Sequence, residues 1–129
     1  MKYSILLPAY NEGDLTGIIS RITSKHDFSI IIIDDGSEIP IFLSSEFSKV
    51  AILRNKTNRG KGYSILKGIK YAKEIGSSHS IVMDADSQHL PDDIEAFIQN
   101  TTPNDDLVLG YRNFKSPMPI HRIISNKIT

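Results

Sequence analysis

The chain has 129 residues, which suits one domain, and its 40% hydrophobic and 23% charged residues are ordinary for a folded protein. Lysine plus arginine and aspartate plus glutamate both number 15, so the charge gives no reason to expect a nucleic-acid partner. The lack of cysteine excludes a disulfide scaffold and a thiolate zinc site. No apolar run suits a signal peptide or the ~20 residues of a membrane helix. We therefore expect one cytoplasmic domain over residues 1–129.

In chain order, short apolar runs alternate with segments of helical periodicity. The runs predict strands buried on both faces at Tyr3–Leu7, Ser29–Ile33, Val50–Leu53, Ser80–Met83 and Leu107–Leu109. The periodic segments predict helices at Asp14–Ser24, Lys61–Ile75 and Pro91–Asn100, and a short helix is one interpretation of Pro40–Lys49. In the second helix the periodic positions are Ile65, Leu66, Ile69 and Ala72. The fold class is therefore α/β, with an open, mostly parallel sheet and flanking helices.

Each predicted strand is followed by polar, glycine or proline residues. These clusters are Pro8–Glu12, Asp34–Ser37, Arg54–Asn55 with Asn58–Gly62, Asp84–His89, and Gly110–Arg112. Ordinary turn chemistry accounts for some of them, since Asp-Gly and Asn-x-Gly are common turn formers. It does not account for four carboxylates at the ends of two strands. Because ligands of open α/β sheets bind beyond the carboxyl ends of the strands, we expect the clusters to meet at one site.

The pair Asp84 and Asp86 predicts a metal site. In an extended backbone these side chains project to the same side, where two carboxylates repel each other unless a cation lies between them. Oxygen ligands of this kind suit Mg²⁺ or Mn²⁺, and Gln88 is a further candidate ligand, with His89 as a hydrogen-bonding neighbour. The alternative is a solvated acidic turn that precedes a helix beginning at Pro91.

The clusters, taken in order, resemble the motifs of the family 2 glycosyltransferases, and most closely those of the polyprenyl-phosphate (dolichyl-phosphate) sugar synthases. The matching segments are Pro8–Glu12, Ile33–Ser37, Asn58–Gly62, Asp84–His89 and Gly110–Arg112. The resemblance covers essentially the whole chain. It implies the Rossmann-like glycosyltransferase-A fold and transfer of a sugar from a UDP- or GDP-sugar donor.

The resemblance also implies roles for matching positions. Base and ribose of the donor would lie against Pro8, Tyr10, Glu12, Asp34 and Asp35. The ribose and the metal would face Asp84, next to Ala85, with Asp86 as the central metal ligand and Gln88 beside it. Arg112 would place a positive charge near phosphate, and it and Asp86 are the expected catalytic residues. The alternative for Arg112 is a surface arginine without a partner.

The segment that includes Asn58 and Lys61 precedes a predicted helix, where a glycine-rich turn can approach an anion closely. A tight turn with a simple helix cap is the alternative. The Asn58–Gly62 segment is not a Walker loop, because the required spacing of glycine and lysine is absent.

Family members continue for about another hundred residues, the size of a further domain half. The resemblance therefore implies a truncated fold with a donor-binding half and no acceptor half. The leading hypothesis is inverting, metal-dependent transfer of the sugar to a polyprenyl phosphate or another acceptor. The alternative is a catalytically incomplete nucleotide-sugar binding module or truncated remnant. A receiver-like phosphorylation switch would place its acidic pair after the first strand, where this chain has Pro8–Tyr10. A nucleotidyltransferase would need a glycine-, arginine- or lysine-rich phosphate loop after the first strand, and Pro8–Glu12 is not such a loop.

The C-terminal tail is basic, since no acid follows Asp106. From Ile120 onward, apolar residues lie on one face of a predicted helix: Ile120, Ile123, Ile124 and Ile128. One interpretation is a helix that packs on the sheet. The other is an amphipathic helix that contacts anionic lipid at the cytoplasmic membrane face, or another subunit. Apolar surface left uncovered by a missing half would also favour a homo-oligomer.

Overall fold

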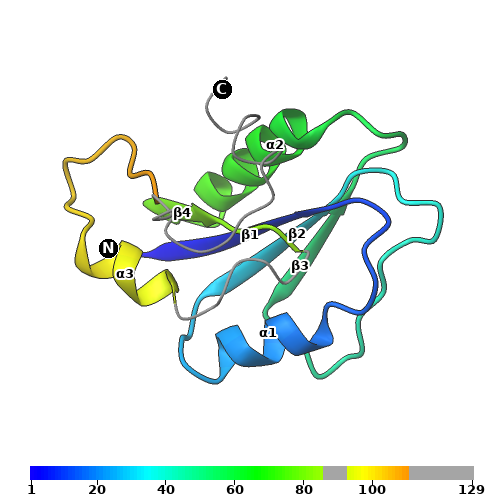
Figure 1. Ribbon diagram of the computed structural model, residues 1–129, viewed down its shortest axis with the longest axis horizontal. Coiled ribbons are helices and arrows are strands. Elements are labelled where there is room, and N and C mark those ends of the chain that lie inside the picture. Colours follow the sequence, from blue (N-terminus) through cyan, green and yellow to red (C-terminus); the bar gives the residue numbers. More distant parts are fainter. Residues whose placement is uncertain (86–92, 111–129) are drawn as a thin grey trace, which may run out of the picture.

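The computed structural model describes residues 1–85 and 93–110, which form a parallel sheet between helices (Figure 1). The elements in chain order are β1 (Tyr3–Ala9), α1 (Thr16–Thr23), β2 (Ser29–Asp34), β3 (Val50–Arg54), α2 (Lys61–Glu74), β4 (His79–Val82) and α3 (Asp93–Gln99). None of the helices in this part of the chain combines the length and the apolarity needed to cross a bilayer.

The described sheet has four strands in the order β3-β2-β1-β4, and every pair is parallel. Leu6 of β1 is in register with Ile31 of β2 on one side and with Val82 of β4 on the other. Strand β1 is therefore central, which explains its continuous apolar sequence. Because all four strands run the same way, the segments that follow them leave the sheet at one edge (Figure 1).

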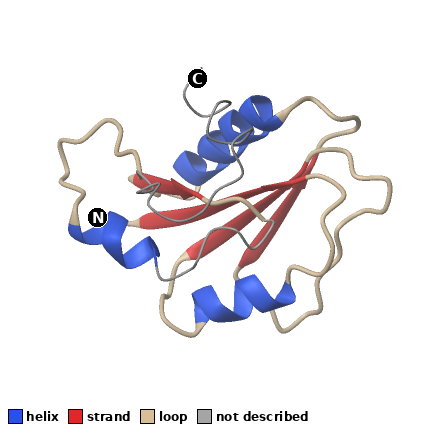
Figure 2. Ribbon diagram, viewed as in Figure 1, coloured by secondary structure: helices blue, strands red, loops and turns tan. Residues whose placement is uncertain are grey.

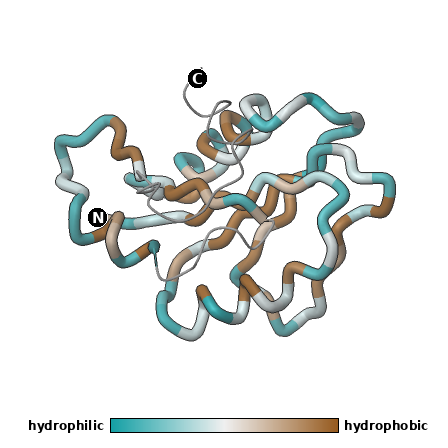
Figure 3. The backbone as a smooth tube through the Cα atoms, viewed as in Figure 1, coloured by the Kyte–Doolittle hydropathy of each residue, from teal (hydrophilic) through white to brown (hydrophobic). Residues whose placement is uncertain are grey.

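The core has two parts, one on each face of the sheet, because successive strand residues point to opposite sides. On one face, Tyr3, Ile5 and Leu7 cluster with Ile19 of α1 and Ile94 of α3. On the other face, Leu6, Ile31 and Ile33 cluster with Ala72 of α2. Figure 2 shows the strands between α2 on one side and α1 on the other, and Figure 3 shows that the strands are the most hydrophobic segments.

Helix α2 packs on the sheet through small residues, which differs from the stripe that periodicity predicted. Its buried residues are Ser64, Gly68 and Ala72, whereas Leu66 is 68% exposed and Ile69 is 43% exposed. A Cβ atom at Gly68 would lie 2.8 Å from Cδ1 of Ile33. The close approach of helix and sheet therefore needs small residues, and Leu66 and Ile69 face outward.

Two further predicted elements are wrong. Leu107–Leu109 is not a strand, and Leu107 and Leu109 are strongly exposed rather than buried. Pro40–Lys49 contains no helix. It is a loop that joins two neighbouring parallel strands, and Ile41 and Phe47 pack against the core from it. The other four strands and the three helices are confirmed, although the predicted beginning of α3 at Pro91 lies outside the described residues. Burial on both faces holds for β1 and β2 but not for β3 and β4, where Ile52 is 37% and Val82 is 38% exposed, because these two are the outer strands of the described sheet.

Candidate nucleotide-sugar site

A pocket of about 300 Å³ lies at the edge where the strands end, and segments that follow all four strands line it. That volume is at the lower end of the range for small-molecule sites. Its lining residues are Pro8, Ala9, Tyr10, Glu12, Asp35, Asn58, Gly60, Lys61, Ser64, Asp84 and Ala85. The pocket is thus where residues far apart in the sequence come together.

Asp35 organises the floor of this pocket. Its backbone N–H donates to the carbonyl of Ala9 at 2.8 Å, which joins the ends of β1 and β2. Asp35 is buried, with 4% of its surface exposed. Its carboxylate accepts hydrogen bonds from the N–H groups of Arg59 (2.8 Å) and Gly60 (2.9 Å) and from Nδ2 of Asn55 (2.7 Å). The side chain therefore fixes the loop that leads into α2.

Burial alone would raise the pKa of Asp35, because a carboxylate loses water when it is buried. The hydrogen bonds from Arg59, Asn55 and Gly60 favour the charged form more strongly, so the pKa lies below its ordinary value. Asp35 is consequently an anion at neutral pH, held by donors from the loop beside it.

Helix α2 begins at the pocket wall. Gly60 immediately precedes it with φ +91°, a conformation that favours glycine, and Lys61 is its first residue. The Lys61 ammonium forms an ion pair with the carboxylate of Asp84. Both side chains are partly exposed at the pocket, so this wall carries one fixed positive and one fixed negative charge.

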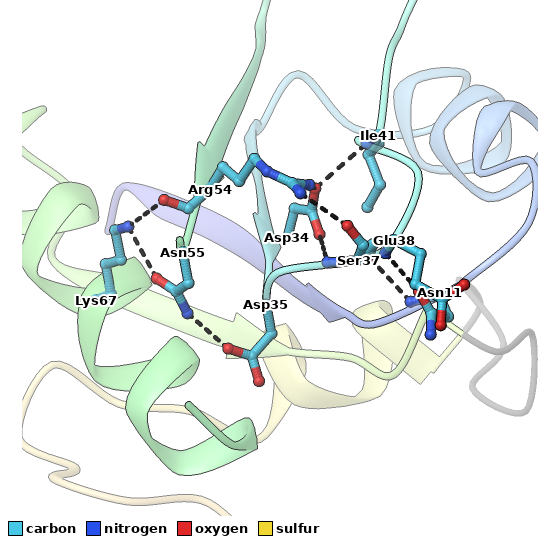
Figure 4. Close-up of polar contacts among 9 residues, drawn as sticks. All are labelled: Asn11, Asp34, Asp35, Ser37, Glu38, Ile41, Arg54, Asn55 and Lys67. Carbon is cyan, nitrogen blue, oxygen red and sulfur yellow. Dashed lines mark hydrogen bonds and ion pairs between the residues drawn. The ribbon is translucent and has the colours of Figure 1, made fainter. Parts of the chain in front are cut away.

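Asp34 is adjacent to Asp35 in sequence but does not line the pocket. Its buried carboxylate pairs with Arg54 and accepts hydrogen bonds from the N–H groups of Ser37 (2.9 Å) and Ile41 (3.3 Å), as Figure 4 shows. Burial would raise the pKa of Asp34, but the hydrogen bonds from Ser37, Ile41 and Arg54 lower it below its ordinary value. Asp34 therefore anchors the segment after β2.

Most of the predicted nucleotide-sugar residues are brought together. The pocket lining includes Pro8, Tyr10, Glu12, Asp35, Asn58, Lys61, Asp84 and Ala85, and Asp34 is the described residue of the predicted set that it leaves out. Asp86, Gln88 and His89 lie outside the described residues, as do Arg112 and the basic tail. Their predicted roles stay predictions.

The described part of the site holds one of the three predicted metal ligands, Asp84. Within residues 1–85 and 93–110 there is no group of three or more His, Cys, Asp or Glu side chains placed to hold a metal ion. Asp84 is a carboxylate at the pocket wall, the ligand type that a hard divalent cation prefers, and its partner in the described structure is the Lys61 ammonium.

Sequence reasoning missed Ser64, which lines the pocket, and placed Asn55 in a strand-end cluster without giving it a role. Both are buried, and Nδ2 of Asn55 donates to Ser64 Oγ at 3.1 Å as well as to Asp35. Asn55 was visible as the polar residue directly after a strand. Ser64 had no signal of its own, because its role depends on α2 turning that residue toward the sheet.

The pocket offers polar groups and an exposed aromatic ring to a ligand. The Lys61 ammonium, which pairs with Asp84, lines it together with Asn58 and with Tyr10, which is 45% exposed. Carboxylates of Glu12 and Asp84 can accept from hydroxyl groups or hold a cation. A flat polar ring with an attached diphosphate meets these requirements.

The chain is similar in sequence to known glycosyltransferases. The family model described as glycosyl transferase family 2 matches residues 4–125. The chain is 30% identical to the UDP-N-acetylglucosamine–dolichyl-phosphate N-acetylglucosaminyltransferase of Methanococcus voltae, over 95% of this chain and 58% of that protein. It is 32% identical to the dolichol-phosphate mannosyltransferase of Pyrococcus furiosus, over 89% of this chain and 34% of that protein.

An uncharacterized protein of Methanocaldococcus jannaschii is 33% identical over 94% of this chain and 56% of its own length. The chain thus spans little more than half of these relatives at most. The family match, by contrast, covers nearly all of the chain. The chain therefore belongs to glycosyl transferase family 2, and its parallel sheet with flanking helices is consistent with the glycosyltransferase-A fold.

Proposed function

We propose that this chain is the donor-binding part of a metal-dependent glycosyltransferase and that its pocket holds a UDP- or GDP-sugar. The observation that carries the proposal is the pocket at the common edge of four parallel strands, lined by residues from four of the family motifs. Ligands bind at this edge in open α/β sheets, and the pocket carries charges suited to a diphosphate and a cation.

We assign the base and ribose to the wall formed by Pro8, Tyr10, Glu12 and Asp35, where an exposed aromatic ring and two carboxylates lie. The diphosphate belongs near Asn58 and Lys61, at the beginning of α2, where an ammonium group offsets negative charge. Asp34 contributes indirectly, by holding the segment that follows β2.

We propose that Asp84, together with Asp86 and Gln88, holds Mg²⁺ or Mn²⁺. Asp84 offers a carboxylate ligand at the pocket wall, and a divalent ion bound there would take the place that the Lys61 ammonium has in the ion pair. A divalent ion bound there would act as a Lewis acid that stabilises the negative charge on the departing diphosphate. The contribution of Lys61 is a second positive charge on the same wall, and Arg112 is proposed as a third.

The proposed acceptor is a polyprenyl phosphate, because two relatives carry dolichyl or dolichol phosphate in their names. A phosphate oxygen of the acceptor would form a bond to C1 of the sugar. The bond from C1 to the donor diphosphate would break, and its electron pair would leave with the nucleoside diphosphate. A single displacement of this kind inverts C1, and an anionic acceptor needs no strong base.

The membrane-facing and oligomeric roles remain proposals. We propose a cytoplasmic chain that attaches to the cytoplasmic membrane face through its basic tail, which lies outside the described residues. Co-sedimentation with vesicles that contain or lack anionic lipid tests the attachment, and a chain that pellets with neither contradicts it. We also propose that the chain forms a homo-oligomer, which sedimentation velocity at several concentrations tests.

Calorimetric titration with UDP and with GDP, each with and without Mn²⁺, tests the donor site. We expect one nucleotide to bind in a metal-dependent manner to the wild type, and this binding to be lost in Asp84→Ala and Asp86→Ala. Asp27→Ala is the matched control, because it removes an equally charged side chain whose partner is the exposed Lys49. Absence of binding to either nucleotide would contradict the proposed function.

Transfer of a labelled sugar from the nucleotide that binds to a polyprenyl phosphate separates the two hypotheses. Product formation supports the enzyme. Nucleotide binding without transfer or donor hydrolysis supports the alternative, a catalytically incomplete binding module or remnant.

A further inference from the structure

Two loops at the pocket are joined by a reciprocal pair of hydrogen bonds. The N–H of Asn11 donates to Oγ of Ser37 at 2.9 Å, and the N–H of Glu38 donates to Oδ1 of Asn11 at 2.9 Å (Figure 4). The partners are 26 and 27 residues apart in sequence. We call this pair of bonds between Asn11 and the Ser37–Glu38 segment the latch.

The latch holds Asn11, which lies between two pocket residues in the sequence. Asn11 follows Tyr10 and precedes Glu12, and both of these line the pocket. Asn11 has φ +50°, the left-handed conformation that asparagine tolerates better than most residues with a side chain. Because this local turn sets the directions of the side chains on either side, the hydrogen bonds of Asn11 determine where Tyr10 and Glu12 lie.

The other half of the latch is fixed to the sheet. Ser37 donates its N–H to Oδ1 of Asp34 at 2.9 Å, and its carbonyl accepts from Nη2 of Arg54 at 2.7 Å. Asp34 and Arg54, the last residues of β2 and β3, pair with each other. A continuous set of contacts thus runs from two strand ends through Ser37 to Asn11.

We propose that Asn11 and Ser37 are positioning residues that preorganise the Tyr10 and Glu12 wall of the pocket and thereby set its affinity for the nucleotide. The inference rests on the proposed function, because it takes a nucleotide as the ligand of this wall. A wall held in its bound geometry loses less conformational entropy on binding, so the loss of the latch weakens affinity without removing a contact to the ligand.

A purely structural role would have a different signature. Asn11 and Glu38 are exposed residues, so water can replace the lost partner in Asn11→Gly and its free energy of unfolding should change little. Ser37 is buried and its side chain also bonds to Asp34, so Ser37→Ala should cost some stability as well. An effect on nucleotide affinity larger than the effect on stability therefore points to positioning.

The variants separate the hydroxyl acceptor from side-chain size. Ser37→Ala removes the acceptor for the Asn11 N–H, whereas Ser37→Thr retains a hydroxyl group. Asn11→Gly removes Oδ1 but tolerates the left-handed backbone. Ser44→Ala is the matched control, because Ser44 lies in the same loop as Ser37 and its hydroxyl donates to the exposed Glu46 rather than to the latch.

Nucleotide affinity by calorimetry is measured for each variant with the nucleotide and metal that bind the wild type. We expect Ser37→Ala and Asn11→Gly to bind about two- to tenfold more weakly, the range for one lost hydrogen bond. Ser37→Thr and Ser44→Ala should stay within about twofold of the wild type. Amide hydrogen exchange should show faster exchange at Asn11 in Ser37→Ala but not in Ser44→Ala, which confirms the bond itself.

The outcomes separate the two claims. If the wild type binds and Ser37→Ala and Asn11→Gly bind equally tightly, the proposed function stands and the positioning role is overturned. If their affinity falls only in proportion to a loss of stability in urea, the positioning role is also overturned. If the wild type binds neither nucleotide, the proposed function fails, and the positioning role fails with it.

Discussion

Two neighbouring aspartates at the end of β2 illustrate how one dipeptide can serve two loops. Asp34 contacts Arg54 and Ser37, whereas Asp35 contacts Asn55 and the loop that begins α2 (Figure 4). Their side chains diverge because successive strand residues point to opposite faces. The pair therefore connects the ends of three strands to the pocket, and only the second aspartate lines it.

Arg54→Ala should destabilise the fold by about 2 kcal/mol, less than the loss of a fully buried partner, because the arginine side chain is 37% exposed. The variant leaves the Asp34 carboxylate buried without its charged partner, with hydrogen bonds from Ser37 and Ile41 alone. Urea denaturation followed by circular dichroism measures the change. Lys49→Ala provides the control, since it breaks an exposed ion pair with Asp27 and should cost under about 0.5 kcal/mol. Equal effects of the two variants would contradict this account of Asp34.

The free energy of unfolding should fall as the pH drops below the ordinary carboxyl value of 3.8. The pKa of Asp34 and that of Asp35 are both below that value in the folded protein, where hydrogen bonds outweigh the opposing effect of burial. The unfolded chain therefore binds more protons in this window, and stability present above 3.8 is lost as pH falls through the folded values.

Urea denaturation at a series of pH values measures this slope. Asp34→Asn and Asp35→Asn should each have a shallower slope than the wild type, because neither variant can take up that proton. An unchanged slope in both would show that other carboxylates, such as Asp14 with its lowered pKa, carry the dependence.

At the scale of elements, two glycines should respond in opposite ways to the same substitution. Gly17→Ala, in α1, should stabilise the protein by about 0.5–1 kcal/mol, because its Cβ would meet nothing within 4 Å and alanine favours helix. Gly36→Ala should destabilise it by more than about 2 kcal/mol. Gly36 has φ +75°, and a Cβ there would lie 2.5 Å from the backbone carbon of Thr57.

Thermal or urea unfolding of both variants measures the two effects. A neutral Gly36→Ala would mean that the loops after β2 and β3 do not pack as closely as described. The close contact at Gly36 joins the backbones of two loops rather than two side chains.

The sequence was sufficient for elements whose apolar pattern matches their burial. The runs that became β1 and β2 were predicted because both faces of these strands are covered. The prediction of a strand at Leu107–Leu109 was wrong because an apolar run does not reveal whether a partner strand is available. The buried face of α2 was predicted wrongly because its contacts use Ser64 and Gly68, and the prediction looked for large apolar side chains.

The site was predictable where chemistry and position coincide at a strand end, as for Asp35 and Asp84. The distinction between Asp34 and Asp35 was not predictable, because it depends on which loop each side chain meets. The latch was not predictable either, since Asn11 and Ser37 become neighbours only when β1 and β2 pair.

At the scale of the whole molecule, the pocket depends on every described strand. Residues that line it follow β1, β2, β3 and β4, and the α2 terminus completes the wall. A ligand bound there would contact segments that range from Pro8 to Ala85 in the chain. Its binding energy should therefore stabilise the complete fold rather than one loop.

The bound nucleotide should accordingly raise the melting temperature. With Mn²⁺ and nucleotide at about one hundred times the dissociation constant, linkage adds about 2.7 kcal/mol, or roughly 10 °C for a domain of this size. Differential scanning calorimetry measures the shift, which Asp84→Ala should reduce strongly and Asp27→Ala should leave unchanged. Inorganic phosphate at equal ionic strength controls for general anion effects. Because Asp84 lines the pocket, an equal rise of the melting temperature in wild type and Asp84→Ala would contradict its proposed part in binding the metal and the nucleotide.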